Sequence, residues 1–136
     1  MKLQKKAVLV IVLLVSILLA GCAPSGAETI EEIPSGAKKI TTIDLTGQTG
    51  TYTDGDINVW TDGYLILDVN IKSGTVNTIE IADLTLEETI HSIKKPKKGI
   101  YDSVIYGYRS GRDYGLNFVN SKNLTGSIDV YFIPND

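Results

Sequence analysis

The chain has 136 residues, a formal net charge of −3, one cysteine and one histidine. Residues 1–21 carry three lysines and no acids, so the remainder has 10 basic and 16 acidic residues, a net charge of −6. An acidic surface gives no reason to expect nucleic acid as a partner. One cysteine excludes an internal disulfide and a thiolate zinc site. The length after residue 21 suits a single domain.

The N-terminus has the order of a secretory signal peptide. Three lysines (Lys2, Lys5 and Lys6) precede an apolar run from Ala7 to Ala20, and small residues follow before Cys22. As a helix the run would rise about 21 Å, whereas a bilayer core is about 30 Å thick. The segment is therefore too short for a comfortable transmembrane span. An uncleaved N-terminal anchor is the alternative.

The residues Leu19-Ala20-Gly21-Cys22 resemble the lipobox of prokaryotic lipoproteins. The resemblance implies removal of residues 1–21 and a diacylglyceryl group on Cys22. It also implies attachment to the cell membrane through this lipid, on the periplasmic or extracellular side. Residues 22–38, with prolines, glycines and acids, are typical of a flexible linker. The remaining residues, 39–136, are predicted to form one folded domain.

Short apolar runs separated by turn residues predict an all-β domain. About eight strands are expected, near residues 40–45, 57–60, 64–71, 76–81, 89–93, 101–108, 114–120 and 127–133. Their inward faces are predicted from period-two alternation and include Leu65/Leu67/Val69/Ile71, Ile79/Ile81, Tyr114/Leu116/Phe118 and Ile128/Val130/Phe132. Residues 82–88 are ambiguous between a helix start and strand or loop. The spacing is typical of an antiparallel sandwich or small barrel, and we predict a two-sheet β-sandwich.

Two segments resemble the GOLD-type (emp24-like) β-sandwich. Asp62 to Gly74 is followed by a strand, and Tyr114-Gly115-Leu116-Asn117-Phe118-Val119-Asn120 precedes a closing strand that ends in Tyr131-Phe132. The sequence departs from the family pattern at Asp113, where a glycine is expected. The resemblance implies a non-catalytic interaction module and carries over no catalytic residue.

Asp54, Asp56 and Asn58 place side-chain oxygens at alternate positions, as the first half of a calcium loop does. The EF-hand pattern fails, because Val59 and Leu65 stand where glycine and glutamate are required. A sandwich loop could still bind calcium through these residues. A simple turn between strands is the other interpretation, and turn chemistry favours it.

Aromatic residues suggest a binding surface. The chain has seven tyrosines and one tryptophan, and Trp60, Tyr106 and Tyr108 are candidates for contact with a protein or carbohydrate partner. Alternatively, the tyrosines cover sheet faces, and Trp60 closes the end of the core. The lysines at 94–98 are expected to form a solvated turn that could touch anionic lipid or wall polymer.

No catalytic signature is found. His91 is the only histidine, and no Gly-x-Ser-x-Gly elbow surrounds any serine. Asn123-Leu124-Thr125 fits the N-glycosylation sequon, which matters only in a cell that glycosylates exported proteins. The sequence therefore favours a lipid-anchored, non-enzymatic binding module without a cofactor. The alternatives are an envelope hydrolase or a calcium-dependent carbohydrate-binding module.

Overall fold

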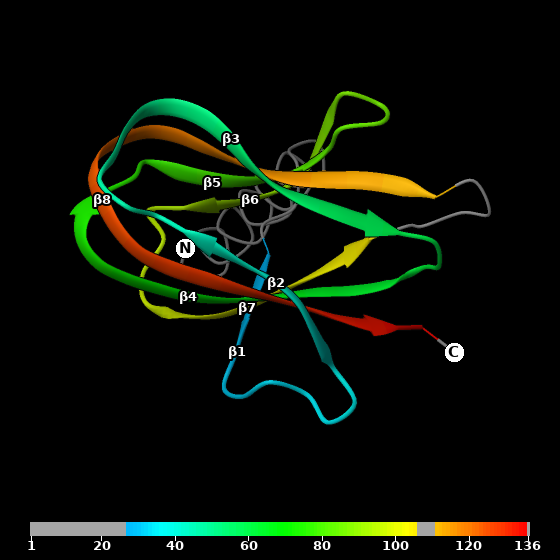
Figure 1. Cartoon of the computed structure of the whole chain (residues 1–136). Helices are drawn as coiled ribbons and strands as arrows, with labels where there is room; N and C mark the ends of the chain where they lie inside the picture. The colour runs from blue at the N-terminus through cyan, green and yellow to red at the C-terminus, as the bar shows by residue number, and fades with distance from the viewer. Residues whose placement is uncertain (1–26, 106–110, 136) are drawn as a thin grey trace, which may run out of the picture.

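The computed structural model describes residues 27–105 and 111–135, and every regular element in them is a β-strand (Figure 1). The strands, in chain order, are β1 Glu28–Ile30, β2 Lys38–Asp44, β3 Gln48–Val59, β4 Gly63–Thr75, β5 Thr78–Asp83, β6 Glu88–Lys94, β7 Gly99–Ile105 and β8 Arg112–Pro134. All strand pairs are antiparallel. The predicted all-β, antiparallel fold is therefore confirmed. The described residues include no helix long and apolar enough to cross a membrane.

The eight strands form one curled sheet in the shape of a half-barrel. Its main path runs β1-β7-β4-β8-β5-β6, and β2 and β3 pair with β8 beside this path. The first part of β8 pairs with β3 and β5, whereas the last part pairs with β2 and β4. Because β8 belongs to both regions, the sheet folds over into two facing halves that enclose the core (Figure 1).

The long strand β8 differs from the prediction of two strands at 114–120 and 127–133. The intervening segment looked like a turn because it contains Asn120, Asn123 and Gly126. These three residues do have positive φ angles, of 53°, 49° and 126°. They shift the pairing register and bend β8, but they do not end it. Lys122, Leu124 and Thr125 still pair with residues of β3 or β4.

The core follows the alternation predicted from the sequence. Leu65, Leu67 and Val69 of β4 are fully buried, and the inward residues of β5 and the first part of β8 are buried as well. Ile71 and Phe132 are only partly buried and pack against the edge of the core. Ile66 is also buried, although it points to the other face of β4. Apart from Ile66, these residues lie on the inward faces of their strands, so the core fills the space between the two halves.

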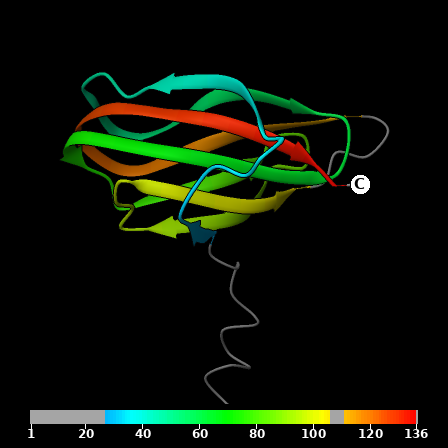
Figure 2. The ribbon, with the colours of Figure 1, turned by 90° about the horizontal axis from the view of Figure 1, so that it is seen from below.

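Two seams separate the edges of the halves. At the front seam β2 and β3 lie next to each other and both pair with β8, but they do not pair with each other. At the back seam the edge strands β1 and β6 meet, and the amide of Ala27 donates a hydrogen bond to the carbonyl oxygen of Ser92 at 3.4 Å. In Figure 2, β1 lies on one side of the molecule with β6 and β7, and β2 and β3 lie on the opposite side.

Two local findings refine the sequence analysis. β1 lies inside the segment 22–38 that composition assigns to a linker, and it pairs with β7 from Glu28 opposite Asp102 to Ile30 opposite Ile100. Residues 84–87 form a turn, in which the Asp83 carboxylate accepts hydrogen bonds from the amides of Thr85 and Leu86. Asp83 thus makes the contacts of a helix cap, but the chain turns directly into β6.

Candidate binding surface at the loop end

Three connections gather at one end of the curled sheet, which we call the loop end. They are the β3–β4 turn (60–62), the β5–β6 turn (84–87) and the start of β8 (111–113). The antiparallel order places them together, because β3, β5 and β7 all run toward this end (Figure 1). Connections between the strands of a sheet are free to vary without disturbing the core, which makes them frequent binding sites.

Trp60 is the most exposed large apolar residue among those described, with 63% of its surface accessible. Its indole covers the backbone of Gly111, where a Cβ atom would lie 3.3 Å from the ring. Gly111 has a φ of +77° and no side chain, so the ring can rest directly on the chain. The structure therefore places Trp60 at the rim of the loop end and not in the core.

Asp113 links the start of β8 to the end of β3 and to the β5–β6 turn. Its carboxylate accepts a hydrogen bond of 2.6 Å from the Asn58 side-chain amide, and its carbonyl oxygen accepts one of 2.7 Å from the amide of Leu84. Its own amide donates to the hydroxyl of Thr85 at 3.0 Å. Backbone held by several bonds loses little entropy when a partner binds. The loop end is therefore a preorganised surface.

Two leucines of the β5–β6 turn add apolar area that the sequence analysis missed. Leu84 and Leu86 are 42% and 50% exposed, and Tyr64 at the start of β4 is 37% exposed. The signal was available, because leucines in a turn capped by Asp83 cannot both reach the core. Tyr106 and Tyr108, the other predicted contact residues, lie outside the described residues.

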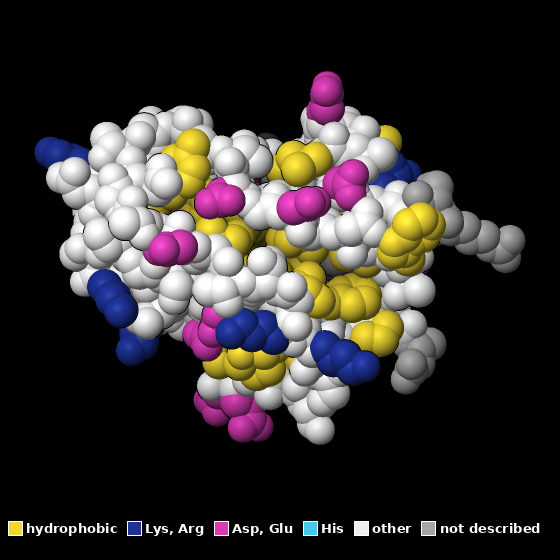
Figure 3. All heavy atoms as spheres, viewed as in Figure 1, with side chains coloured by type: hydrophobic (Ala, Val, Ile, Leu, Met, Phe, Trp, Pro, Cys, Tyr) yellow, Lys and Arg dark blue, Asp and Glu magenta, His cyan; other side chains and the backbone are white. Residues whose placement is uncertain are grey.

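The predicted calcium residues are divided between two places. Asp54 and Asp56 line a groove of about 480 Å³ at the front seam, together with Asp44 of β2. Asn58 instead binds Asp113 at the loop end. Acidic side chains are visible on this face in Figure 3. No group of three or more His, Cys, Asp or Glu side chains in the described part of the chain is placed to hold a metal ion.

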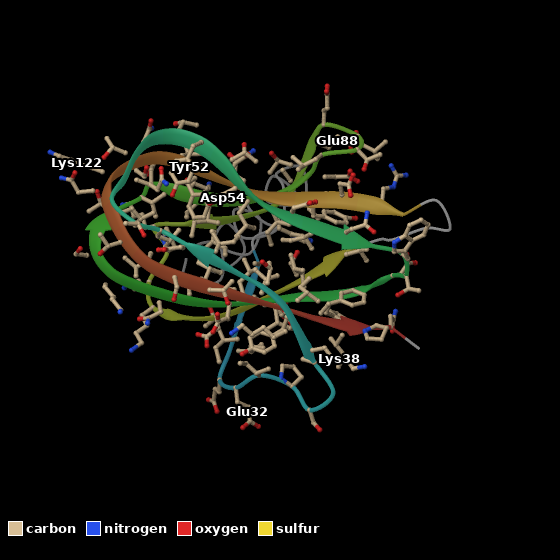
Figure 4. All side chains as sticks on the ribbon, in the orientation of Figure 1. Glu32, Lys38, Tyr52, Asp54, Glu88 and Lys122 are labelled. Carbon is tan, nitrogen blue, oxygen red and sulfur yellow. The ribbon has the colours of Figure 1, made fainter. Side chains whose placement is uncertain are left out.

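Tyr52 lies beside Asp54 on β3 (Figure 4) and stacks on Phe118, with 4.8 Å between ring centroids. Its hydroxyl is buried without a hydrogen-bond partner in the structure. Burial of this hydroxyl, reinforced by the negative charge of Asp54, raises the pKa of Tyr52 to about 12. The phenol is therefore neutral at physiological pH and unsuited to act as a base.

At the back seam, Glu28 and Asp102 stand opposite each other on β1 and β7. Burial, and then the charge of Glu28, raise the pKa of Asp102, while His91 acts in the opposite direction. Like charges directly across a strand pair are destabilising. Ionisation of Asp102 therefore opposes the pairing of β1.

We expect Asp102→Asn to increase the free energy of unfolding at pH 7. A raised pKa in the folded state means that the folded state loses stability as pH rises, so the gain should vanish below about pH 4, where Asp102 is protonated in both states. Urea titrations at several pH values measure this. Asp129→Asn is the matched control and should lower the free energy of unfolding at pH 7. Hydrogen bonds from Thr42 and Lys39 lower the pKa of Asp129, so its ionised form stabilises the fold. A loss of stability in Asp102→Asn at pH 7 would contradict the expectation.

No protein-family model, no curated protein and no solved structure matches this chain. The site therefore rests on its own geometry. That geometry supplies a fixed, partly aromatic surface at the loop end and an acidic groove at the front seam.

Proposed function

We propose that the protein is an exported lipoprotein, held at the membrane through a lipid on Cys22, whose domain is a non-catalytic binding module. The proposal takes the two halves of the curled sheet as the layers of a β-sandwich, of the kind that the GOLD-like segments suggest. The observation that carries binding is the exposed Trp60 on a preorganised loop end. Tryptophan at a fixed surface gives large contact area at a small entropic cost.

The chemistry of the described side chains supports binding over catalysis. Tyr52 is neutral at physiological pH, and the carboxylates at the loop end serve as hydrogen-bond acceptors for backbone and amide groups. Trp60, Tyr64 and the two turn leucines instead offer apolar and aromatic contact. We propose an envelope protein or a carbohydrate as the partner, since both are recognised by aromatic platforms with a polar surround.

A calcium-dependent carbohydrate-binding module is the second candidate. It is suggested by the groove at the front seam, which Asp44, Asp54 and Asp56 line on neighbouring strands, although the structure does not group these three carboxylates as metal ligands. Calcium binds six to eight oxygen ligands, so these side chains would have to move together to form a site. If the melting temperature rose with calcium and fell with EDTA, this candidate would replace the first.

Cys22→Ser is expected to abolish lipid attachment. In the proposed modification the sulfur of Cys22 displaces the headgroup phosphate of a phospholipid and forms a thioether with its diacylglyceryl group, and a serine hydroxyl is a much weaker nucleophile for this step. Expression in a bacterium with labelled palmitate, followed by fractionation, measures both incorporation and membrane association. Ser16→Ala, a change within the same N-terminal segment, should leave labelling intact. Labelling that persisted in Cys22→Ser would refute the anchor.

Trp60→Ala is expected to weaken partner capture while costing less than about 1 kcal/mol of stability, because a mostly exposed side chain loses little burial. Tyr106→Ala is made in parallel. Pull-down from the native envelope measures capture, and thermal melts measure stability. Ile40→Ala is the control, since Ile40 is an exposed apolar residue of β2 outside the loop end. Unchanged capture by both folded aromatic variants would sink the proposal.

A further inference from the structure

Four exposed lysines cluster at the end of β6 and in the connection that follows it: Lys94, Lys95, Lys97 and Lys98, which we call the basic turn. They are four of the nine Lys and Arg residues in the described part of the chain. The turn has a defined backbone. The amide of Lys95 donates to the carbonyl oxygen of Asn77 at 2.8 Å, and the hydroxyl of Tyr101 bonds both the amide and the carbonyl oxygen of Lys97. The charges are thus displayed from a fixed segment.

The basic turn borders an open groove of about 510 Å³ at the back seam. Ile93 and Tyr101 form part of its apolar lining, Thr29 and Ser92 contribute hydroxyls, and three of the lysines stand at its edge. Cations and hydroxyls around a shallow apolar surface suit an anionic headgroup. The ion pair of Lys39 with Asp129 lies on other strands, β2 and β8.

The chain that leads to Cys22 enters the fold at this same groove, because Ala27 is one of its lining residues. Five residue steps separate Cys22 from Ala27, and an extended chain spans at most about 18 Å over that length. A lipid on Cys22 would therefore keep the back seam within about 18 Å of the bilayer surface. The basic turn lies on the side of the molecule that this short connection brings closest.

Acidic side chains lie on the opposite side as well as beside the back seam, where Glu28 and Asp102 pair. The acidic groove with Asp44, Asp54 and Asp56 lies at the front seam, and β2 and β3 face away from β1 in Figure 2. A domain with a net negative charge is repelled by an anionic membrane unless its basic region approaches first. The charge distribution thus favours one orientation, with the front seam directed away from the bilayer.

We infer that the basic turn docks on anionic phospholipid headgroups, as a second membrane contact beside the lipid on Cys22. This inference rests on the anchor in the proposed function. A diacylglyceryl group has two acyl chains, which already suffice for stable attachment, so the basic turn would set the orientation of the domain on the membrane. Docking would also hold the loop end in a constant position relative to the membrane.

The test uses the mature chain from Cys22 to Asp136 with one acyl chain coupled chemically to the Cys22 thiol. Partitioning is measured on phosphatidylcholine vesicles with and without phosphatidylglycerol. The chain should prefer the anionic vesicles at low salt, and Lys94→Gln/Lys97→Gln/Lys98→Gln should reduce that preference roughly 10- to 100-fold. The control, Lys38→Gln/Lys72→Gln/Lys122→Gln, removes the same charge from β2, β4 and β8 and should retain most of the preference. Figure 4 shows Lys38 and Lys122 far apart on the molecule. Circular dichroism verifies that both variants fold.

Equal losses in the two triple variants, or no preference for anionic vesicles, would overturn the inference. A second measurement is modification of lysines by a water-soluble acylating reagent. The basic turn should be protected on anionic vesicles, while Lys38 and Lys122 stay reactive. If the turn instead bound soluble polyphosphate but remained reactive on vesicles, its ligand would be a wall polymer and docking on lipid would be wrong. Chemical coupling keeps this result separate from whether cells acylate Cys22.

Discussion

Gly126→Ala is expected to cost at least about 2–3 kcal/mol, since φ at this position is +126° and side chains are strained there. Space forbids the methyl group as well. A Cβ atom at Gly126 would lie 2.0 Å from the carbonyl oxygen of Asn70, so β4 and β8 would have to separate where Gly126 pairs with Ile71. Because β8 links the two halves of the sheet, the loss should reach the whole domain. Urea denaturation measures the free energy.

Gly47→Ala is the matched control for Gly126→Ala. Gly47 also has a positive φ, of +63°, but a Cβ atom there meets nothing within 4 Å. Only the backbone preference is lost, which costs roughly 1 kcal/mol. Equal losses in the two variants would show that the contact between β4 and the bend of β8 does not constrain the fold.

Phe118→Ala is expected to destabilise the domain by about 3–5 kcal/mol, the usual cost of truncating a buried phenylalanine. Phe118 is fully buried, stands opposite Ile79 of β5 and stacks on Tyr52 of β3. The cavity would therefore open between three strands of one half. Tyr52→Phe keeps the stacked ring and removes a buried hydroxyl that has no partner, so it should be neutral or slightly stabilising. A Phe118→Ala loss below about 1 kcal/mol would show that the neighbouring strands close the cavity.

Several elements were predictable because their signals are local. Period-two alternation identified the buried faces of β4 and β5. The length of β3 was not predictable. This strand begins at Gln48 and continues through Gly50 and Gly55, although glycines usually end strands. It continues because β8 supplies pairing partners before and after each register shift.

The candidate site was only partly foreseen. The sequence allowed Trp60 either to contact a partner or to close the end of the core, and its 63% exposure in the structure places it at the rim. Leu84 and Leu86 were missed because residues 82–88 were ambiguous between a helix start and strand or loop, and only the turn capped by Asp83 shows that both are exposed. The separation of Asn58 from Asp54 and Asp56 came from a register shift between Asp54 and Ile57, which breaks the alternation on which the calcium prediction depended.

By itself, the sequence determined the antiparallel β character of this protein, its main core faces and the motif that ends at Cys22. Each depends on neighbouring residues, through side-chain alternation, turn propensity or a contiguous run. Only the tertiary structure decided that β8 is one bent strand shared by both halves, that β1 joins the sheet, and that the basic turn lies beside Ala27. These features depend on pairing between segments far apart in the chain. In β8, hydrogen bonds with distant strands override the local preference of Asn120, Asn123 and Gly126 for a turn.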